Sequence, residues 1–185
     1  FLAYIYNTYD DFDAVQEEEG KIVKDEANKT VTVTENGVTV NIAYTEVADK
    51  WLINTVTVAG RDEKVKAFSQ SVYNDDTNAD LDYVLQYEAT GTPDNYEKGA
   101  LKSKIVYKAE GKEVNYSLSY EGKKEEEVVV SRSDYTYIEG KLDSVTEYDV
   151  RDVAVGAISN NTDKIKTFIK YKDGEHIDYS IGYIN

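Results

Sequence analysis

The chain of 185 residues holds 36 acidic and 21 basic side chains, which gives a formal net charge of -15. Binding to nucleic acid or to an anionic membrane requires basic surface, so this balance argues against both partners. Cysteine is absent, which excludes disulfides, thiolate metal sites and cysteine nucleophiles. Tyrosine occurs 17 times and proline once. Because tyrosine, valine and threonine favour a pleated surface over a helix, we expect an all-β protein.

The first 19 residues admit two interpretations. Apolar residues follow helical spacing from Leu2 to Phe12, which predicts a short helix lying on a sheet. The glutamates at 17–19 would lie at the unfavourable end of the helix dipole, and this favours an added edge strand instead. We expect residues 1–30 to form an N-terminal segment that packs on the sheet or extends it, and residues 31–185 to form a repeated-hairpin β domain.

A repeat organises most of the remaining chain. Residues 99–120 and 163–183 share a glycine, alternating apolar positions and two closing tyrosines. Residues 63–87 form a looser third copy, and residues 137–148 form a half copy. In each full copy, two runs with a period of two flank a turn, and this pattern is typical of a β-hairpin.

The apolar face of one hairpin explains why the unit recurs. Val114, Tyr116, Leu118 and Tyr120 share a face, and the polar residues between them share the other. A lone hairpin cannot bury such a face, so similar hairpins are expected to pair edge to edge. We predict an antiparallel meander of repeated β-hairpins, forming a curled sheet, a barrel or a sandwich, with one short N-terminal helix as an option.

The tyrosine-rich face of these hairpins needs a cover. This face is expected to carry Tyr116, Leu118, Tyr179 and Ile181. An apolar face stabilises a fold only when other residues exclude water from it. Residues 1–19 are the segment that escapes the repeat. We therefore expect residues 1–19 to cover this face.

One spaced motif within the repeat resembles a known family. The motif Y-x-x-G-x-L-x-S-x-x-x-Y is held by Tyr96, Gly99, Leu101, Ser103 and Tyr107, and again by Tyr137, Gly140, Leu142, Ser144 and Tyr148. It resembles the YD-type hairpin repeats of Rhs-like shell proteins and of surface lipoproteins of Bacteroidota, over roughly residues 60–185. The chain departs from that pattern, since Ala100 or Lys141 replaces the usual arginine and the Tyr-Asp pair is mostly missing. The resemblance implies an extracellular, non-catalytic β protein, tethered to the outer membrane through a lipidated residue absent from this chain.

The acidic stretch at 75–82 suggests a calcium site. Asp76, Asn78, Asp80 and Asp82 alternate, as oxygen ligands do in loops that fold around one calcium ion. The glycine and the closing glutamate that such loops use are both missing. The alternative is a solvated hairpin loop, and no other cofactor is expected.

Aromatic side chains suggest a ligand surface. Trp51 is the single indole, and with Tyr116 and Tyr120 it could stack on the apolar face of a sugar. Their regular period equally fits packing within the sheet. His176 is the only histidine, and another copy of the repeat has glutamate at that position, so we expect a surface residue and no catalytic role.

These observations predict a secreted or cell-surface, non-catalytic β protein with a structural or binding role, and not an enzyme. Its expected partners are a glycan or another surface protein. One alternative is a glycan-binding module or a glycan-active hydrolase with paired carboxylates near Trp51. Another is an extracellular filament subunit assembled by strand addition, so the chain is expected to be either a monomer or such a subunit. The sequence contains no apolar run long enough to cross a bilayer, and its first residue is Phe1, so we expect that an export signal, a tag or a lipid anchor was removed.

Overall fold

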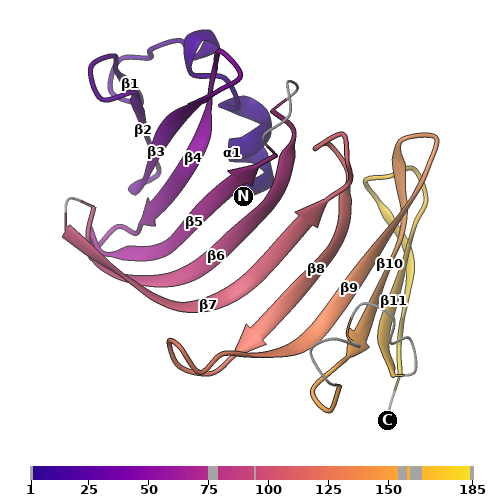
Figure 1. Cartoon of the computed structure of the whole chain (residues 1–185). Helices are drawn as coiled ribbons and strands as arrows, with labels where there is room; N and C mark the ends of the chain where they lie inside the picture. The colour runs from indigo at the N-terminus through magenta and orange to yellow at the C-terminus, as the bar shows by residue number, and fades with distance from the viewer. Residues whose placement is uncertain (1, 75–78, 94, 154–157, 159–163, 184–185) are drawn as a thin grey trace. The chain divides into compact units, whose positions relative to one another are not determined.

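The computed structural model describes residues 2–74, 79–93, 95–153, 158 and 164–183. An α-helix, α1 (Leu2–Thr8), and a 3-10 helix, η1 (Phe12–Ala14), precede the strands (Figure 1). The strands are β1 (Ile22–Asp25), β2 (Thr30–Glu35), β3 (Val38–Val47), β4 (Lys50–Ala59), β5 (Val65–Tyr73), β6 (Leu81–Thr92), β7 (Asn95–Tyr107), β8 (Val114–Glu121), β9 (Val128–Ile138), β10 (Lys141–Asp149), β11 (Ile165–Tyr171) and β12 (Ile177–Gly182). No helix in these ranges is long and apolar enough to cross a bilayer.

The strands form one antiparallel sheet whose spatial order is the order of the sequence. Each strand pairs with the strands before and after it, and β1 and β12 lie at the two ends of the order. This arrangement confirms the predicted all-β meander of hairpins with one short N-terminal α-helix. The sequence left open a curled sheet, a barrel or a sandwich. The described strands form a single sheet with two edges.

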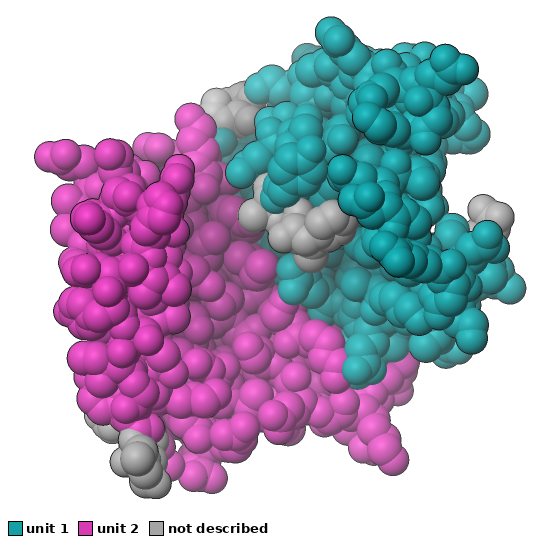
Figure 2. All heavy atoms as spheres, turned by 180° about the vertical axis from the view of Figure 1, so that it is seen from behind, with its two compact units in different colours: residues 1–100 teal, residues 101–185 magenta. Residues whose placement is uncertain are grey.

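The contacts divide the chain into two compact units, which we describe separately. Unit 1 comprises residues 1–100 and unit 2 comprises residues 101–185, drawn in teal and magenta in Figure 2. The N-terminal segment at 1–30 belongs to unit 1 together with the strands up to β6. The division falls within β7.

The core of unit 1 lies between the N-terminal segment and strands β2 to β4. Register pairing places Val31, Ile42 and Val56 side by side on one face, and all three are fully buried. Ile5 of α1 and Phe12 of η1 pack on them, with exposed fractions of 1% and 0%. Branched side chains suit this face because they pack against their cross-strand neighbours on a pleated surface.

Of the two interpretations of the first 19 residues, the helix is the one observed. α1 ends at Thr8, so the glutamates at 17–19 lie outside it and do not oppose its dipole. A hydrogen bond of 2.8 Å between the Tyr6 hydroxyl and Ser71 Oγ joins α1 to β5. The N-terminal segment is thereby attached to the face of the sheet.

Unit 2 has a separate and smaller core. Tyr148 and Val150 at the end of β10 are buried together with Ile158. Leu118 of β8 packs against this cluster from the sheet. Val150 and Ile158, which follow β10, therefore cover part of unit 2.

The expected cover of the tyrosine face is wrong. Residues 1–19 contribute to the core of unit 1, whereas Leu118 is covered by residues of unit 2. Tyr179 and Ile181 keep exposed fractions of 47% and 44%. The physical reason is that the face of β2 to β4 consists mainly of valine and isoleucine. The faces rich in tyrosine carry hydroxyl groups that water can satisfy.

Candidate functional site

Three hairpins share one register, and they are the three copies of the sequence repeat. We call β5–β6 copy 1, β7–β8 copy 2 and β11–β12 copy 3. In each copy, a tyrosine that ends the first strand pairs with an aliphatic residue that begins the second. The pairs are Tyr73 with Leu81, Tyr107 with Val114, and Tyr171 with Ile177. The register then shifts past one residue, which is Asp82, Asn115 or Asp178. The repeat thus includes a bulge at a fixed position.

One backbone hydrogen bond closes the loop in every copy. The N–H groups of Asn74, Lys108 and Lys172 donate to the carbonyls of Asp80, Glu113 and His176, at 3.1, 2.8 and 2.9 Å. The three acceptor residues therefore hold one equivalent position. Their side chains are chemically different, so the shared role of this position is the backbone hydrogen bond and not the binding of a common ligand.

The predicted calcium ligands fall at this loop. Asp76 and Asn78 lie outside the described residues. Asp80 accepts the closing backbone bond through its carbonyl, and Asp82 is the exposed bulge residue of copy 1. Within the described ranges, no group of three or more His, Cys, Asp or Glu side chains could hold a metal ion. The equivalence of Asp80 and Asp82 with residues of the other copies supports the hairpin-loop interpretation.

β12, the second strand of copy 3, exposes its apolar face. The exposed fractions are 59% for Ile177, 47% for Tyr179, 44% for Ile181 and 46% for Tyr183. The equivalent residues of β8 in copy 2 are all half-buried, namely Val114, Tyr116, Leu118 and Tyr120. Copies with the same sequence pattern and the same register therefore differ in how far they are covered.

The strand after copy 2 contributes to the cover on β8, together with the cluster of Tyr148, Val150 and Ile158. Its Arg132, in β9, pairs in register with Leu118. The guanidinium carbon of Arg132 lies 4.5 Å from the ring centroid of Tyr116, and Nε donates to Asp134 Oδ1 at 2.6 Å. The Arg132 side chain is only 12% exposed. A cation held this way is attracted to the negative face of the ring and shields it from water.

The strand after copy 1 also places a cation over a tyrosine, at the position that corresponds to Tyr120 and not to Tyr116. Lys98 Nζ, in β7, lies 4.0 Å from the ring centroid of Tyr87 in β6 and 5.8 Å from that of Phe68 in β5. Phe68 is buried, and Tyr87 is half-buried. Both inner copies therefore receive a basic side chain from the next strand.

The backbone of β12 offers hydrogen-bonding groups on its outer side. The Tyr183 N–H donates to the carbonyl of Lys166 at 2.9 Å. Because bonding alternates along an antiparallel pair, Ile181 also directs its N–H toward β11, whereas Ser180 and Gly182 direct theirs away. No described strand pairs with β12 on that side. An edge of this kind is a template for another strand.

β1, the strand at the other end of the order, is protected. It has only four residues, and its pairing with β2 directs the N–H groups of Ile22 and Lys24 outward. The Ile22 N–H donates to the carbonyl of Glu18 at 2.8 Å, and the Lys24 N–H donates to Glu17 Oε1 at 3.2 Å. Short strands with satisfied or charged edges resist further pairing.

The predicted sugar-stacking residues are partly covered by cations. Trp51 lies in unit 1, packed against its core, with Lys29 Nζ 5.2 Å from the ring centroid. Tyr116 and Tyr120 lie on β8 of unit 2, where Arg132 covers Tyr116. A sugar that stacked on Trp51 or Tyr116 would have to displace these cations.

Unit 1 contains an apolar pocket of about 360 Å³. Ile5 and Tyr9 of the N-terminal segment line it on one side, and valines of β2 to β4 line it on the other. Burial raises the pKa of Tyr9. Glu35 is the one carboxylate in the lining, so the pocket itself does not supply the carboxylate pair that glycoside hydrolysis uses.

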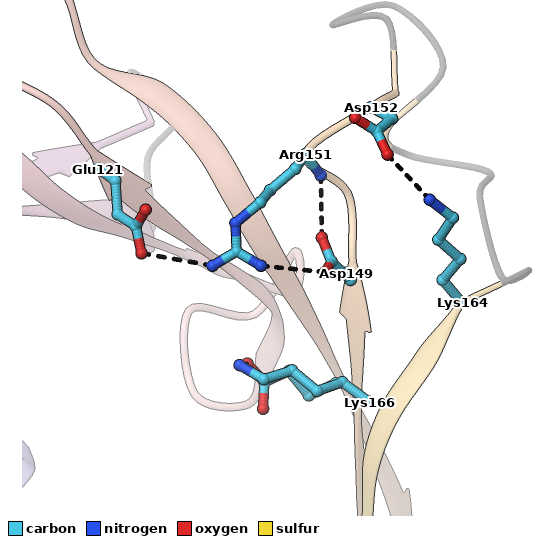
Figure 3. Close-up of polar contacts among 7 residues, drawn as sticks. Glu121, Asp149, Arg151, Asp152, Lys164 and Lys166 are labelled. Carbon is cyan, nitrogen blue, oxygen red and sulfur yellow. Dashed lines mark hydrogen bonds and ion pairs between the residues drawn. The ribbon is translucent and has the colours of Figure 1, made fainter. Parts of the chain in front are cut away.

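A network of ion pairs lies near the start of the connection after β10 (Figure 3). Arg151 contacts Glu121 at 3.4 Å and Asp149 at 3.0 Å, and Lys164 contacts Asp152 at 3.0 Å. The backbone N–H of Arg151 and then its charge lower the pKa of Asp149. Solvent and salt screen pairs of this kind, so each contributes little to stability.

His176 is a surface residue in the loop of copy 3. Its Nδ1 lies 2.9 Å from Asp173 Oδ2, and its backbone N–H donates to Asp173 Oδ1 at 2.9 Å. The backbone bond, followed by the imidazole, lowers the pKa of Asp173 to about 2. The same carboxylate raises the pKa of His176. The pair is local to one turn and lies apart from any pocket lining described above.

The outer edge of β12 is the surface that sequence reasoning missed. The repeat identified the apolar face, but not which copy would lack a neighbour on one side. A signal was present in the basic residues, because Lys98 and Arg132 each follow a full copy by one strand. Their role emerges only when the register is known.

Comparisons with known proteins identify no family for this chain. No family model matches it, and a search of the curated proteins finds no significant match. Among solved structures, a chain from a crystal structure of a GtfA/B complex is similar at 11% identity over 72% of this chain, with a TM-score of 0.31. A chain from a GtfA/B complex bound to UDP and GlcNAc is similar at 16% identity over 92% of this chain, with a TM-score of 0.23. The present chain spans 20% and 26% of those two chains. Both TM-scores are too low to assign a shared fold or function.

Proposed function

We propose that this chain is a non-catalytic structural or binding module of a secreted or cell-surface protein, and that it acts by taking up an additional β-strand at β12. One observation carries the proposal. β12 has the same sequence pattern and register as β8, yet its apolar face and its outer backbone groups are uncovered. Addition of a strand would satisfy both, because main-chain bonds give affinity and alternate side chains give specificity.

The contrast between the two edges supports a one-sided mode of association. Growth of a filament needs two complementary surfaces on each subunit. At β1, the outward N–H groups of Ile22 and Lys24 are already satisfied by the N-terminal segment. We therefore favour docking of one strand at β12 over head-to-tail assembly into a filament.

Composition supports an extracellular location. The chain contains no cysteine and no methionine, so it offers no easily oxidised sulfur, and its 17 tyrosines suit half-exposed strands. The resemblance to YD-type hairpin repeats points the same way. Proteolysis of intact cells of the source organism tests this part of the proposal, because a surface protein is cleaved and an internal one is not.

Selection from a display library of extended peptides tests docking at β12. The matched targets are the unaltered chain, the Ser180→Pro variant and the Ser180→Ala variant. Ser180→Pro removes only an outward N–H, whereas Ser180→Ala keeps it. We expect enriched peptides to bind the unaltered chain and Ser180→Ala and to lose binding to Ser180→Pro. Failure to enrich any peptide, or equal binding to Ser180→Pro, would contradict the proposal.

A further inference from the structure

We infer that the strand recognised at β12 runs antiparallel to it and carries an arginine opposite Ile181, whose guanidinium stacks on Tyr179. This inference rests on the proposed function, because it specifies the chemistry of the strand that β12 takes up. It is drawn from copy 2, where β8 presents the equivalent residues to β9, which the structure describes in full.

The correspondence between β8 and β12 is fixed by the register of the two copies. The bulges at Asn115 and Asp178 align the strands, so Leu118 corresponds to Ile181 and Tyr116 to Tyr179. On β8, the neighbour opposite Leu118 is Arg132. The same register on β12 places an arginine opposite Ile181.

Stacking on the tyrosine is the specific part of the contact. Arg132 reaches diagonally from its place opposite Leu118 to lie 4.5 Å from the ring centroid of Tyr116. Its Nε is bonded at 2.6 Å to Asp134, which is opposite Tyr116 in the register. Tyr179 is 47% exposed and offers the equivalent ring. An arginine that follows this geometry needs an acidic residue two positions after it in the partner strand.

Copy 1 and the charge of the chain support a basic partner independently. Lys98 covers Tyr87, which corresponds to Tyr183 directly after β12. The two copies followed by a described strand thus both receive a cation from it. Asp178 in β12 and Glu175 in the preceding loop are exposed, and the chain as a whole carries a net charge of -15. Charge of this sign attracts a basic segment and speeds its association.

The next position defines an apolar contact. Tyr120 of β8 pairs in register with Val129 of β9, and Tyr183, which directly follows β12, corresponds to Tyr120. We expect a β-branched residue at this place in the partner strand, because aromatic and branched residues pack well across strands. The partner is therefore an extended segment of another polypeptide with the pattern V-x-x-R-x-D, which is how residues 129–134 read.

A synthetic peptide of residues 128–138, which span β9, is the probe. It is titrated into the isotopically labelled chain and followed by NMR, alongside a matched peptide with Arg132→Ala. We expect shifts of the Ser180 and Gly182 amides and binding that is weaker by about fivefold or more for the alanine peptide. Binding should be lost with the Ser180→Pro chain and retained with Ser180→Ala.

A Tyr179→Ser variant of the chain isolates the stacking contact. If arginine acts through the ring, this variant binds both peptides with similar affinity, so the preference for arginine disappears. Equal binding of both peptides by the unaltered chain would overturn the inference, and so would absence of binding. If the display selection still yields peptides that depend on the Ser180 N–H, docking at β12 stands and only the chemistry of the partner is wrong. Association of the chain with itself that Ser180→Pro abolishes would assign the edge to a second copy and would also overturn the inference.

Discussion

The guanidinium of Arg132 lies over the ring of Tyr116, with its central carbon 4.5 Å from the ring centroid. The two residues come from adjacent strands and do not pair directly, since Arg132 is opposite Leu118. The contact joins copy 2 to the strand that follows it. It shows how a tyrosine-rich hairpin becomes an inner part of the sheet.

Replacement of Arg132 by alanine should destabilise the chain by about 1–3 kcal/mol. The variant loses the stacking contact and leaves Asp134 without its 2.6 Å partner. Equilibrium unfolding in urea measures the change. Arg151→Ala is the matched control, because its ion pairs are exposed and should leave the midpoint nearly unchanged. Similar midpoints for both variants would show that the contact over Tyr116 contributes nothing measurable.

Proline at two equivalent positions should have opposite consequences. The register directs the Ser117 N–H toward β9 and the equivalent Ser180 N–H away from β11. We expect Ser117→Pro to cost about 3 kcal/mol or more, because it removes a bond within the sheet. Ser180→Pro should leave the melting temperature within a few degrees of the unaltered chain. Calorimetry on both variants checks this, and a large loss for Ser180→Pro would mean that the assigned direction of its N–H is wrong.

Titration of His176 should report its contact with Asp173. Since His176 is the only histidine, its ring protons give one resolved set of NMR signals. The Asp173 carboxylate favours the protonated imidazole, so the pKa of His176 should lie above 6.5. Asp173→Asn should return it to about 6.5, and an unchanged value in that variant would exclude the pair.

The sign of the pH dependence follows from these two pKa shifts. The raised pKa of His176 contributes stability that is fully present below pH 6.5 and is lost as the pH rises through the raised value. The lowered pKa of Asp173 contributes stability that is present above pH 3.8 and is lost as the pH falls toward 2. The pair therefore acts at about pH 4–6, and its exposure keeps the effect small.

Calcium should not stabilise the chain. Asp80 and Asp82 hold the same places in copy 1 that Glu113 and Asn115 hold in copy 2. We therefore expect the same melting temperature in excess calcium and in chelator, measured by calorimetry. A rise with calcium that saturates would indicate specific binding and would support the predicted site.

The sequence was sufficient to predict the hairpins but not the residues that pack around them. Alternation in residues 112–120 and the returning tyrosines predicted the strands, because period and turn chemistry are local properties. The bulge at Asn115 was not predicted, since one skipped residue changes the register without changing the pattern. Residues 1–19 do not cover the tyrosine-rich face that we expected them to cover. The sequence offers several apolar faces for this segment, and only packing decides among them.

The candidate surface was even less accessible to sequence reasoning. Tyr116 and Tyr179 look alike in the sequence, yet one is half-buried beneath Arg132 and the other is 47% exposed. The difference arises from the neighbouring strand and from the residues after β10 that pack on β8, and both depend on topology. The direction of the Ser180 N–H likewise depends on which pairs along β11–β12 are hydrogen-bonded.

Residue-resolved hydrogen exchange of β8 and β12 tests the central claim most directly. β8 has a neighbour on both sides, so we predict continuous protection of its amides from Tyr116 to Ser119. For β12 we predict alternation, with slow exchange at Ile181 and Tyr183 and fast exchange at Ser180 and Gly182. Continuous protection along β12 in the isolated chain, or alternation in β8, would contradict the open edge on which the proposed function depends.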